Sequence, residues 1–316
     1  MQLDPLLQTF VDAVNGAEPP RVPEDRATME EVNNVMFAQF GEPAPPVADV
    51  RELEIVGPDR RVRARLYHPG GDEPLPGYMF LFGGGWWHGS IDMAANDAVC
   101  RERCVGARCV VLAVDYRLAP EHPFPAGLED AYLGLTWLVD HAAELGIDPQ
   151  RVAIGGGSAG ASLTAGLALL SRDRGGPRAA LQILEAPALD LTLSQPSVPG
   201  ICASLGIDRK LLTDLVALYV PRPEDLEHAY ASPLFAESVA DVPPALIMVC
   251  EHDVLRESGE AYATRLVEAG VPASCVRYCG QLHTSPLLTG VLPAARVWRE
   301  QVIGALRGLH EEGPRL

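Results

Sequence analysis

The chain has 316 residues, of which 47% are hydrophobic and 21% charged, and a formal net charge of −17 at pH 7. This composition is typical of a globular protein, and the length is sufficient for one large or two smaller hydrophobic cores. The strong negative charge disfavours nucleic acids and anionic membranes as partners.

The sequence gives no sign of secretion or membrane insertion. No run approaches the ~20 apolar residues that a membrane-spanning helix needs, and the first residues lack the basic and apolar regions of a signal peptide. The 7 cysteines form no C-x-x-C pair, and no nearby His or Asp completes a zinc set. We therefore expect a cytoplasmic protein with reduced thiols, no membrane span and no bound metal.

Residues 1–48 carry two helical patterns, at 5–14 and 27–40, with proline-rich connections. Apolar residues recur at helical spacing in both segments. We expect two amphipathic helices packed on the main body, or alternatively a mobile lid over an active site.

From Val50 onward the pattern becomes an alternation of strands and helices. Expected strands lie at 53–56, 62–67, 78–82, 109–114, 151–155, 181–185, 245–250 and 274–278. Expected helices lie at 94–105, 127–144, 161–170, 259–269 and 294–309. Such an alternation without internal repeats predicts an α/β fold, with a mostly parallel sheet of about eight strands covered on both faces.

The alternation is interrupted once, at residues 196–232, where the pattern is mainly helical and clearest at 209–220. The predicted core therefore consists of residues 49–195 and 233–316. The interruption and the N-terminal helices of 1–48 lie outside it, so we expect them to form a helical cap.

The segment Gly156-Gly157-Ser158-Ala159-Gly160 joins an apolar run to an Ala/Leu-rich run. Strand, sharp turn and helix is the setting of a G-x-S-x-G nucleophile elbow, in which small flanking residues accommodate a strained serine. Ala159 also leaves its backbone N–H open to a substrate. The pattern predicts Ser158 as a nucleophile, although an ordinary helix N-cap is an alternative.

A serine nucleophile needs a histidine base that a carboxylate holds in the right tautomer. In this architecture the acid and then the base follow late strands. Asp253 follows the strand at 245–250 directly, and His283 comes shortly after the last strand. The other candidates are Glu251 and His252, which belong to a strand end, and His228 and His310, which do not follow a core strand.

Acyl transfer also needs donors for a developing oxyanion. The segment Phe82-Gly83-Gly84-Gly85-Trp86 follows a strand well before the elbow. Its glycines allow backbone N–H groups to approach a ligand closely. We expect an oxyanion loop here, with a plain glycine-rich turn as the alternative. The glycine spacing does not match the G-x-G-x-x-G pattern of dinucleotide-binding proteins.

Together these segments resemble the hormone-sensitive-lipase-like family of α/β-hydrolases, which includes bacterial esterases with an H-G-G-G motif. The most specific string is Asp115–Ala126, which reads D-Y-R-L-A-P-E-H-P-F-P-A, and Asp253–Tyr262 is similar to the segment that bears the family's catalytic acid. The resemblance extends over nearly the whole chain. It implies an α/β-hydrolase fold with a helical cap built from the N-terminus and from an insert before the acid.

The resemblance also implies residue roles. Ser158 would be the nucleophile, Asp253 the acid and His283 the base of a catalytic triad. The oxyanion hole would consist of backbone N–H groups, those of Gly84, Gly85 and Ala159. No metal or organic cofactor is implied.

Three positions depart from the family pattern. The H-G-G-G histidine is Phe82, which cannot hydrogen-bond, so we expect the oxyanion loop to lose a brace. The residue before the nucleophile, commonly Asp, is Gly157, which removes a charge and loosens the elbow. The Gly-Phe that often follows the base is Thr284-Ser285 here. All three are candidate pocket residues.

Three further residues are pocket candidates. Trp86 and Trp87 can line an aromatic pocket, and simple packing is the equally weighted alternative. Glu185 ends the strand after the elbow and can face the pocket, although an ordinary strand-end carboxylate is the default.

The sequence thus favours a serine hydrolase that cleaves carboxylic esters through an acyl-enzyme. Small or medium soluble esters are the expected substrates, because no long, basic amphipathic lid indicates a lipid interface. A dedicated biosynthetic enzyme for acyl transfer, cyclisation or elimination is the alternative. It is favoured by the altered oxyanion loop together with Trp86, Trp87 and His88, which can line an aromatic pocket beside it. A non-catalytic small-molecule-binding module is less favoured, because the triad is complete. An exposed edge strand could pair across a homodimer.

Overall fold

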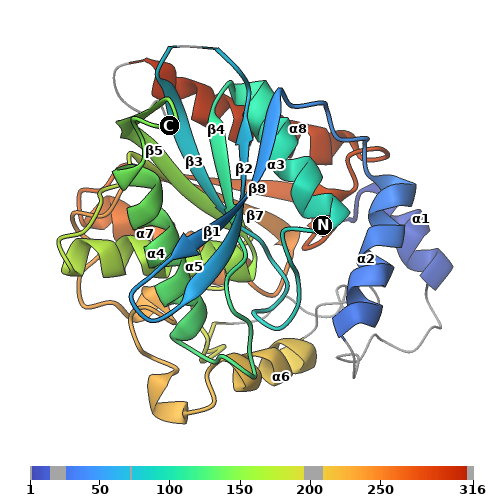
Figure 1. Ribbon diagram of the computed structural model, residues 1–316. Helices are drawn as coiled ribbons and strands as arrows, with labels where there is room; N and C mark the ends of the chain where they lie inside the picture. The colour runs from blue at the N-terminus through green and yellow to red at the C-terminus, as the bar shows by residue number, and fades with distance from the viewer. Residues whose placement is uncertain (1, 15–25, 72, 196–208, 312–316) are drawn as a thin grey trace.

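In the computed structural model, residues 2–14, 26–71, 73–195 and 209–311 are described. The strands are β1 (Asp49–Val56), β2 (Arg61–His68), β3 (Leu75–Leu81), β4 (Val110–Val114), β5 (Ile147–Gly157), β6 (Leu181–Glu185), β7 (Ala245–His252) and β8 (Ala273–Leu282). They form one eight-stranded sheet in the order β1-β2-β4-β3-β5-β6-β7-β8 (Figure 1). Strand β2 is antiparallel to both its neighbours, and all other pairs are parallel. The predicted α/β fold with a mostly parallel sheet is confirmed.

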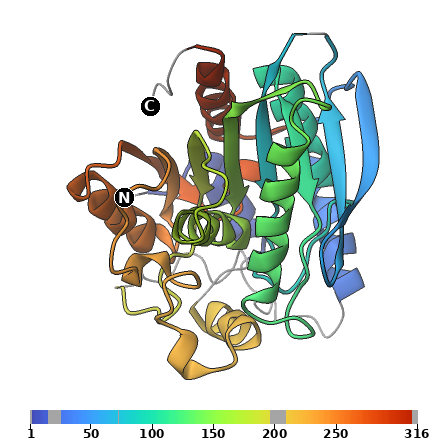
Figure 2. The ribbon, with the colours of Figure 1, turned by 60° about the vertical axis from the view of Figure 1, so that its left-hand side comes forward.

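The helices are α1 (Pro5–Val14), α2 (Arg26–Phe40), α3 (Ala94–Ala107), α4 (Ala126–Asp140), α5 (Ala159–Asp173), α6 (Arg209–Tyr219), α7 (Arg256–Glu268) and α8 (Pro293–Arg307). Short 3₁₀ turns lie at η2 (Pro223–Asp225), η3 (Pro233–Phe235), η4 (Ser285–Leu287) and η5 (Gly308–His310). Figures 1 and 2 show α3 and α8 on one face of the sheet and α4, α5 and α7 on the other. Both faces are therefore covered, as the continuous apolar strands predicted.

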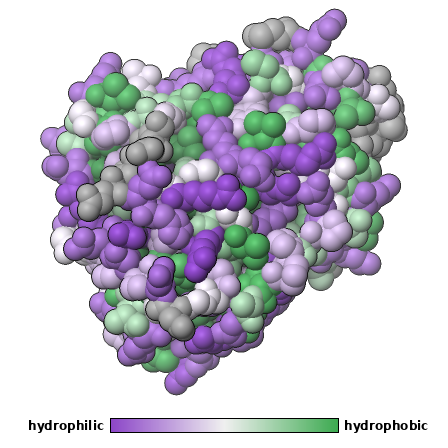
Figure 3. Space-filling model, turned by 90° about the horizontal axis from the view of Figure 1, so that it is seen from above, coloured by the Kyte–Doolittle hydropathy of each residue, from purple (hydrophilic) through white to green (hydrophobic). Residues whose placement is uncertain are grey.

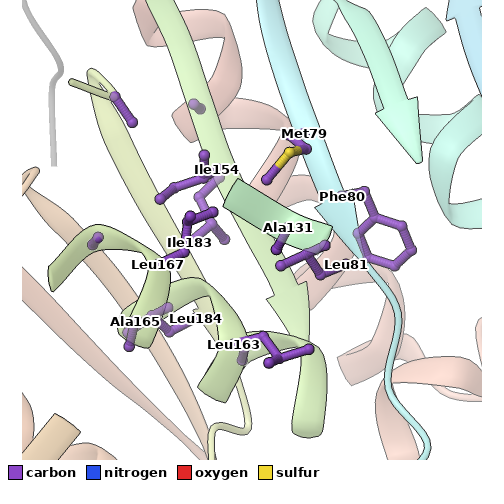
Figure 4. Close-up of a cluster of buried hydrophobic side chains, with 14 of the residues drawn as sticks. Met79, Phe80, Leu81, Ala131, Ile154, Leu163, Ala165, Leu167, Ile183 and Leu184 are labelled. Carbon is purple, nitrogen blue, oxygen red and sulfur yellow. The ribbon is translucent and has the colours of Figure 1, made fainter. Parts of the chain in front are cut away.

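The core lies on both faces of the sheet, and helix α5 contributes a large part of it. Strands β3 and β4 are buried along their whole length, and almost every residue of α5 is buried as well. Figure 4 shows Ile154 and Ile183 of the sheet close to Leu167 of α5. Because α5 has no solvent-facing stripe, the helix that begins at the elbow is held rigidly against the strands that precede it.

Several predicted boundaries differ from the structure, and two of the differences are informative. The helix expected at 127–144 ends at Asp140, and the chain then turns through Gly146, which has a φ of 65°. Strand β8 continues beyond 278 to Leu282, and a bulge interrupts its pairing with β7 in this last part. A bulge breaks the two-residue alternation, so the sequence pattern ended the strand too early.

The segments outside the predicted core contact it at several points. Leu3 and Leu7, at the start of the chain, pack against Leu282 and Leu288 near the end of β8. In α2, the Asn34 side chain accepts a hydrogen bond of 2.9 Å from the first amide of α3. The remaining parts of the expected cap, residues 15–25 and 196–208, lie outside the described residues.

On the face at the end of the sheet away from α6, hydrophobic residues are scattered among hydrophilic ones (Figure 3). In the described part of the chain, no helix combines the length and the apolar character that crossing a membrane requires.

Candidate active site

Ser158 lies in the turn between β5 and α5, with φ 51° and ψ −118°. Such a backbone conformation is strained for a residue with a side chain, and it persists only where the surroundings enforce it. Here a Cβ on Gly156 would lie 2.3 Å from the Leu81 carbonyl oxygen, and one on Gly160 would lie 2.0 Å from it. The small residues that the sequence placed around Ser158 are therefore sterically required.

Two hydrogen bonds link Ser158 to the ends of β7 and β8. Nε2 of His283 lies 2.9 Å from Oγ of Ser158, and Nδ1 lies 2.6 Å from Oδ2 of Asp253. The other carboxylate oxygen of Asp253 accepts the N–H of Leu255 at 3.0 Å. With Nδ1–H donated to the carboxylate, Nε2 is left with a lone pair for the serine proton.

The other residues that the sequence left open point elsewhere. Glu251 is buried, and its Oε2 accepts the backbone N–H of Gly280 at 2.7 Å, across the bulge of β8. His228 packs against Phe124 and Tyr230. Buried His252 ends β7, and Nε2 of His310 lies 2.9 Å from a backbone carbonyl of α3. Among the described residues, only His283 is hydrogen-bonded to Oγ of Ser158.

The glycine-rich loop after β3 lies directly beside the elbow. Gly84 and Gly85 have φ values of 132° and 59°, in the region that favours glycine. A Cβ on Gly83 would lie 3.0 Å from the Gly157 carbonyl oxygen and 3.4 Å from Cβ of Ser158. No group in the described parts of the chain accepts a hydrogen bond from the N–H of Gly84 or Gly85. These donors are therefore available next to Ser158.

Phe82 corrects one sequence-based expectation. Its side chain is 1% exposed and stacks on Tyr116, with ring centroids 4.3 Å apart. The Tyr116 hydroxyl donates a 2.8 Å hydrogen bond to the carbonyl of Phe82. Burial raises the pKa of Tyr116 well above its usual value, so the hydroxyl stays protonated as a donor. The loop is thus braced by aromatic packing, and Phe82 is a buried core residue.

The two tryptophans of the loop are also buried by packing against other parts of the chain. Trp86 is 2% exposed and stacks on Tyr219 of α6, with centroids 4.6 Å apart and ring planes 3° from parallel. Trp87 is buried, and its carbonyl accepts a 2.6 Å hydrogen bond from Nε of Arg26 in α2. Both residues are packed in this way, and both tie the loop to segments outside the predicted core.

The remaining pocket candidates differ from one another. A Cβ on Gly157 would meet no atom of the described residues within 4 Å, so this position has room for a side chain. Half-buried Thr284 follows His283 and precedes η4. The structure corrects the expectation that Glu185 faces the pocket. Arg103 and Trp298 donate hydrogen bonds to its two carboxylate oxygens in the core. Its carbonyl, however, accepts the N–H of Ser158 at 2.7 Å.

Sequence reasoning assigned no role to Tyr116, Arg26 and Arg103, which contact the loop after β3 or Glu185. Tyr116 lies inside the string that carried the family resemblance, which was the only available signal. Arg26 and Arg103 look like ordinary helical arginines in the sequence. His88 follows Trp87, and burial, with a smaller effect from Arg26, lowers its pKa to about 4, so it is neutral at pH 7.

A metal site was not expected. In residues 2–14, 26–71, 73–195 and 209–311, no three His, Cys, Asp or Glu side chains gather as a metal ion would require.

Residues 78–287 match the family described as α/β-hydrolase fold. Carboxylesterase NlhH of Mycobacterium tuberculosis is 36% identical over 98% of this chain and 97% of its own length. Carboxylic ester hydrolase LipN of the same organism is 40% identical over 89% of this chain and 76% of its own. The structure of a hyperthermophilic esterase from the archaeon Pyrobaculum calidifontis has a TM-score of 0.88 at 32% identity, covering 98% of this chain and 99% of that one.

Proposed function

This chain belongs to the hormone-sensitive-lipase-like family of α/β-hydrolases and is a serine ester hydrolase, and we propose that Ser158, His283 and Asp253 are its catalytic triad. The observation that carries the proposal is the continuous pair of hydrogen bonds from Oγ of Ser158 through the imidazole to the buried carboxylate of Asp253. The substrates that we propose are small or medium carboxylic esters.

In the proposed acylation, Nε2 of His283 takes the proton from Oγ of Ser158 as that oxygen attacks the ester carbonyl. The carbonyl oxygen becomes an oxyanion, which accepts hydrogen bonds from the backbone N–H groups of Gly84, Gly85 and Ala159. The C–O bond to the alcohol then breaks, and the imidazolium of His283 returns its proton to the departing alcohol. Asp253 stabilises the imidazolium throughout without taking the proton itself.

Deacylation repeats these steps with water. His283 removes a proton from the water, whose oxygen attacks the acyl-enzyme carbonyl and forms a second oxyanion on the same amides. The bond to Oγ of Ser158 breaks, and the serine recovers its proton from His283. The products are a carboxylic acid and the restored enzyme.

The proposed limit on substrate size rests on what lies over the oxyanion loop. A Cβ on Gly85 would be 2.6 Å from the Leu215 side chain of α6, so this helix closely covers the loop. The Trp86–Tyr219 stack fixes α6 there. We propose that residues 1–48 and 196–232 form a cap over Ser158 and that residues 49–195 and 233–316 form the catalytic core.

The biosynthetic alternative loses its support. It rested on an altered oxyanion loop and on an aromatic pocket, but Phe82, Trp86 and Trp87 are packing residues. Ester hydrolysis is therefore the single function that we propose for this site.

The proposal is tested with Ser158→Ala. We expect the variant to lose turnover of short-chain p-nitrophenyl esters and labelling by a fluorophosphonate, because both reactions form a bond to Oγ of Ser158. Circular dichroism of the same sample shows that it is folded. Turnover at the wild-type rate would mean that another residue is the nucleophile.

A further inference from the structure

An ion pair is buried in the core directly behind the elbow. Arg103 of α3 and Glu185 at the end of β6 are 6% and 8% exposed. The Arg103 guanidinium donates to Oε1 of Glu185, and the indole Nε1–H of Trp298 in α8 donates to Oε2 at 2.6 Å. Both oxygens of one carboxylate are therefore held, each from a different helix on the same face of the sheet.

The Arg103 side chain is equally well fixed. Its second guanidinium nitrogen donates a 2.9 Å hydrogen bond to the Tyr78 hydroxyl. Its guanidinium carbon lies 5.4 Å from the ring centroid of Tyr78 and 5.0 Å from that of Phe80, within cation–π range. The positive charge is thus enclosed by β3 aromatics and one carboxylate.

Net stability is a poor explanation for such a pair. Taking two charges out of water costs so much that well-packed hydrophobic replacements of a buried pair are often as stable or more stable. A buried pair fixes the direction of its side chains more strongly than hydrophobic contacts do, since both groups need specific partners. The role of the pair therefore depends on which part of the chain it orients.

The pair orients the backbone of Glu185, which supports Ser158. The backbone carbonyl of Glu185 accepts the N–H of Ser158 at 2.7 Å, and Glu185 pairs with Gly157 in the sheet. Ser158 and Ala186, which follow these paired residues, have φ values of 51° and 47°, both strained for residues with a side chain. Strained backbone persists only where its surroundings over-determine it.

We propose that Arg103 and Glu185 are positioning residues for the nucleophile. Anchored from α3 and α8, the Glu185 side chain fixes the carbonyl that holds the Ser158 amide, and this contact keeps Oγ directed at His283. Neither residue touches the substrate. The proposal rests on the proposed role of Ser158.

The first test compares Glu185→Gln with a matched control. An amide offers one acceptor oxygen, whereas both carboxylate positions of Glu185 face donors, so the variant loses at least one contact. Glu102→Gln is the control, because Glu102 accepts a 3.1 Å hydrogen bond from Arg299 between the same two helices without touching β6.

For Glu185→Gln we expect kcat and the rate constant of fluorophosphonate labelling to fall by roughly tenfold, with KM within about twofold. Misplacing a reacting group by about 1 Å can cost as much as 100-fold, and a partial loss of anchoring costs less. Glu102→Gln should keep both rates within about twofold. Equal effects of the two variants would overturn the proposal.

The second test separates positioning from stability. In the double variant Arg103→Met/Glu185→Leu, hydrophobic side chains replace the whole pair, so Tm should be equal to or above that of the wild type. We expect kcat and labelling to remain reduced by roughly tenfold in this stable protein, for the same geometric reason. Wild-type kcat and labelling would overturn the proposal. If the double variant does not fold, the comparison of Glu185→Gln with Glu102→Gln decides.

These outcomes are distinct from a failure of the proposed function. Full turnover by Ser158→Ala would contradict the triad and the positioning role together. An inactive Ser158→Ala with fully active Glu185→Gln would leave the triad intact and contradict only the positioning role.

Discussion

The two sides of Ser158 are held by different kinds of interaction. On one side, Asp253 and His283 contact Ser158 in a chain of polar side-chain hydrogen bonds. On the other side, the loop from Gly83 to Trp86 offers backbone amides, and aromatic packing keeps the loop in place. The first side depends on the identity of a few atoms, whereas the second depends on how closely surrounding side chains fill space.

This difference implies two kinds of response to mutation. If the polar chain is the proposed triad, exchanging one of its atoms disrupts proton transfer. In the packed loop, we expect an added atom to lower the rate only if it clashes with a neighbouring group, because the groups that we propose to act there are backbone N–H groups. Variants that change a single atom or methyl group therefore separate the two sides.

The largest expected effect is that of Asp253→Asn. The amide cannot hold His283 in the tautomer that leaves Nε2 free, and kcat should fall by about 10⁴ with the fold retained. Steady-state kinetics on a p-nitrophenyl ester measure this loss.

The control for this change is Glu251→Gln, at the other buried carboxyl of the same strand end. Its contact to Gly280 needs one acceptor, which an amide still supplies. We expect kcat to stay within about tenfold of the wild type, because the hydrogen bond from Gly280 is kept. Reversed effects would assign the catalytic acid to Glu251.

A smaller effect is expected from adding a methyl group to the loop. In Gly84→Ala the new Cβ would lie 2.0 Å from the His88 carbonyl oxygen, at a φ of 132°. The loop must shift and lose an oxyanion donor, which lowers kcat by roughly 10²–10³.

Gly157→Ala is the matched control on the elbow side. Its Cβ meets none of the described atoms within 4 Å, so we expect kcat within about threefold of wild type, since a methyl group without a clash costs little. A large loss here would show that the space beside Gly157 is occupied during the reaction. Esters of increasing size would then be compared, because a loss that grows with size assigns that space to the substrate.

The smallest expected effect concerns stability and pH. The pKa of His88 is lowered to about 4 in the folded protein, mainly by burial, while an unfolded histidine has its usual value of 6.5. Between these values the unfolded chain binds the extra proton, so His88 contributes stability that is complete above pH 6.5 and declines as the pH falls toward 4.

This prediction is measured by urea unfolding at pH 7 and pH 4.5. Other groups also titrate in that range, so the comparison is with His88→Gln, which lacks the ionisable ring. The wild type should lose more unfolding free energy between the two pH values than the variant does. An equal loss in both proteins would contradict a depressed pKa at His88.

The polar side of the site was largely predictable from sequence. Ser158, Asp253 and His283 each follow a strand, and strands are recognisable from local periodicity. In a parallel sheet the carboxyl ends of strands meet at one edge, so residues placed there are brought together by the fold itself. The structure places these three side chains in contact, as the chain order predicted.

The packed side was not predictable, and the alternatives that the sequence left open at Phe82, Trp86 and Glu185 share one physical cause. Each of these side chains is fixed by residues from distant segments, such as Tyr116 for Phe82 and Tyr219 for Trp86. For Glu185 the partners Arg103 and Trp298 lie 82 and 113 residues away. Local sequence shows that a residue ends a strand, but the side-chain direction depends on which distant groups pack around it.

The sequence by itself therefore determined the order of strands and helices, the elbow and the three polar residues around it, because each follows from local periodicity and steric need. Only the tertiary structure decided how the oxyanion loop is braced and where the Glu185 carboxylate points. Those features depend on contacts between helices α3, α6 and α8 and the ends of separate strands. Such contacts exist only once the chain has packed.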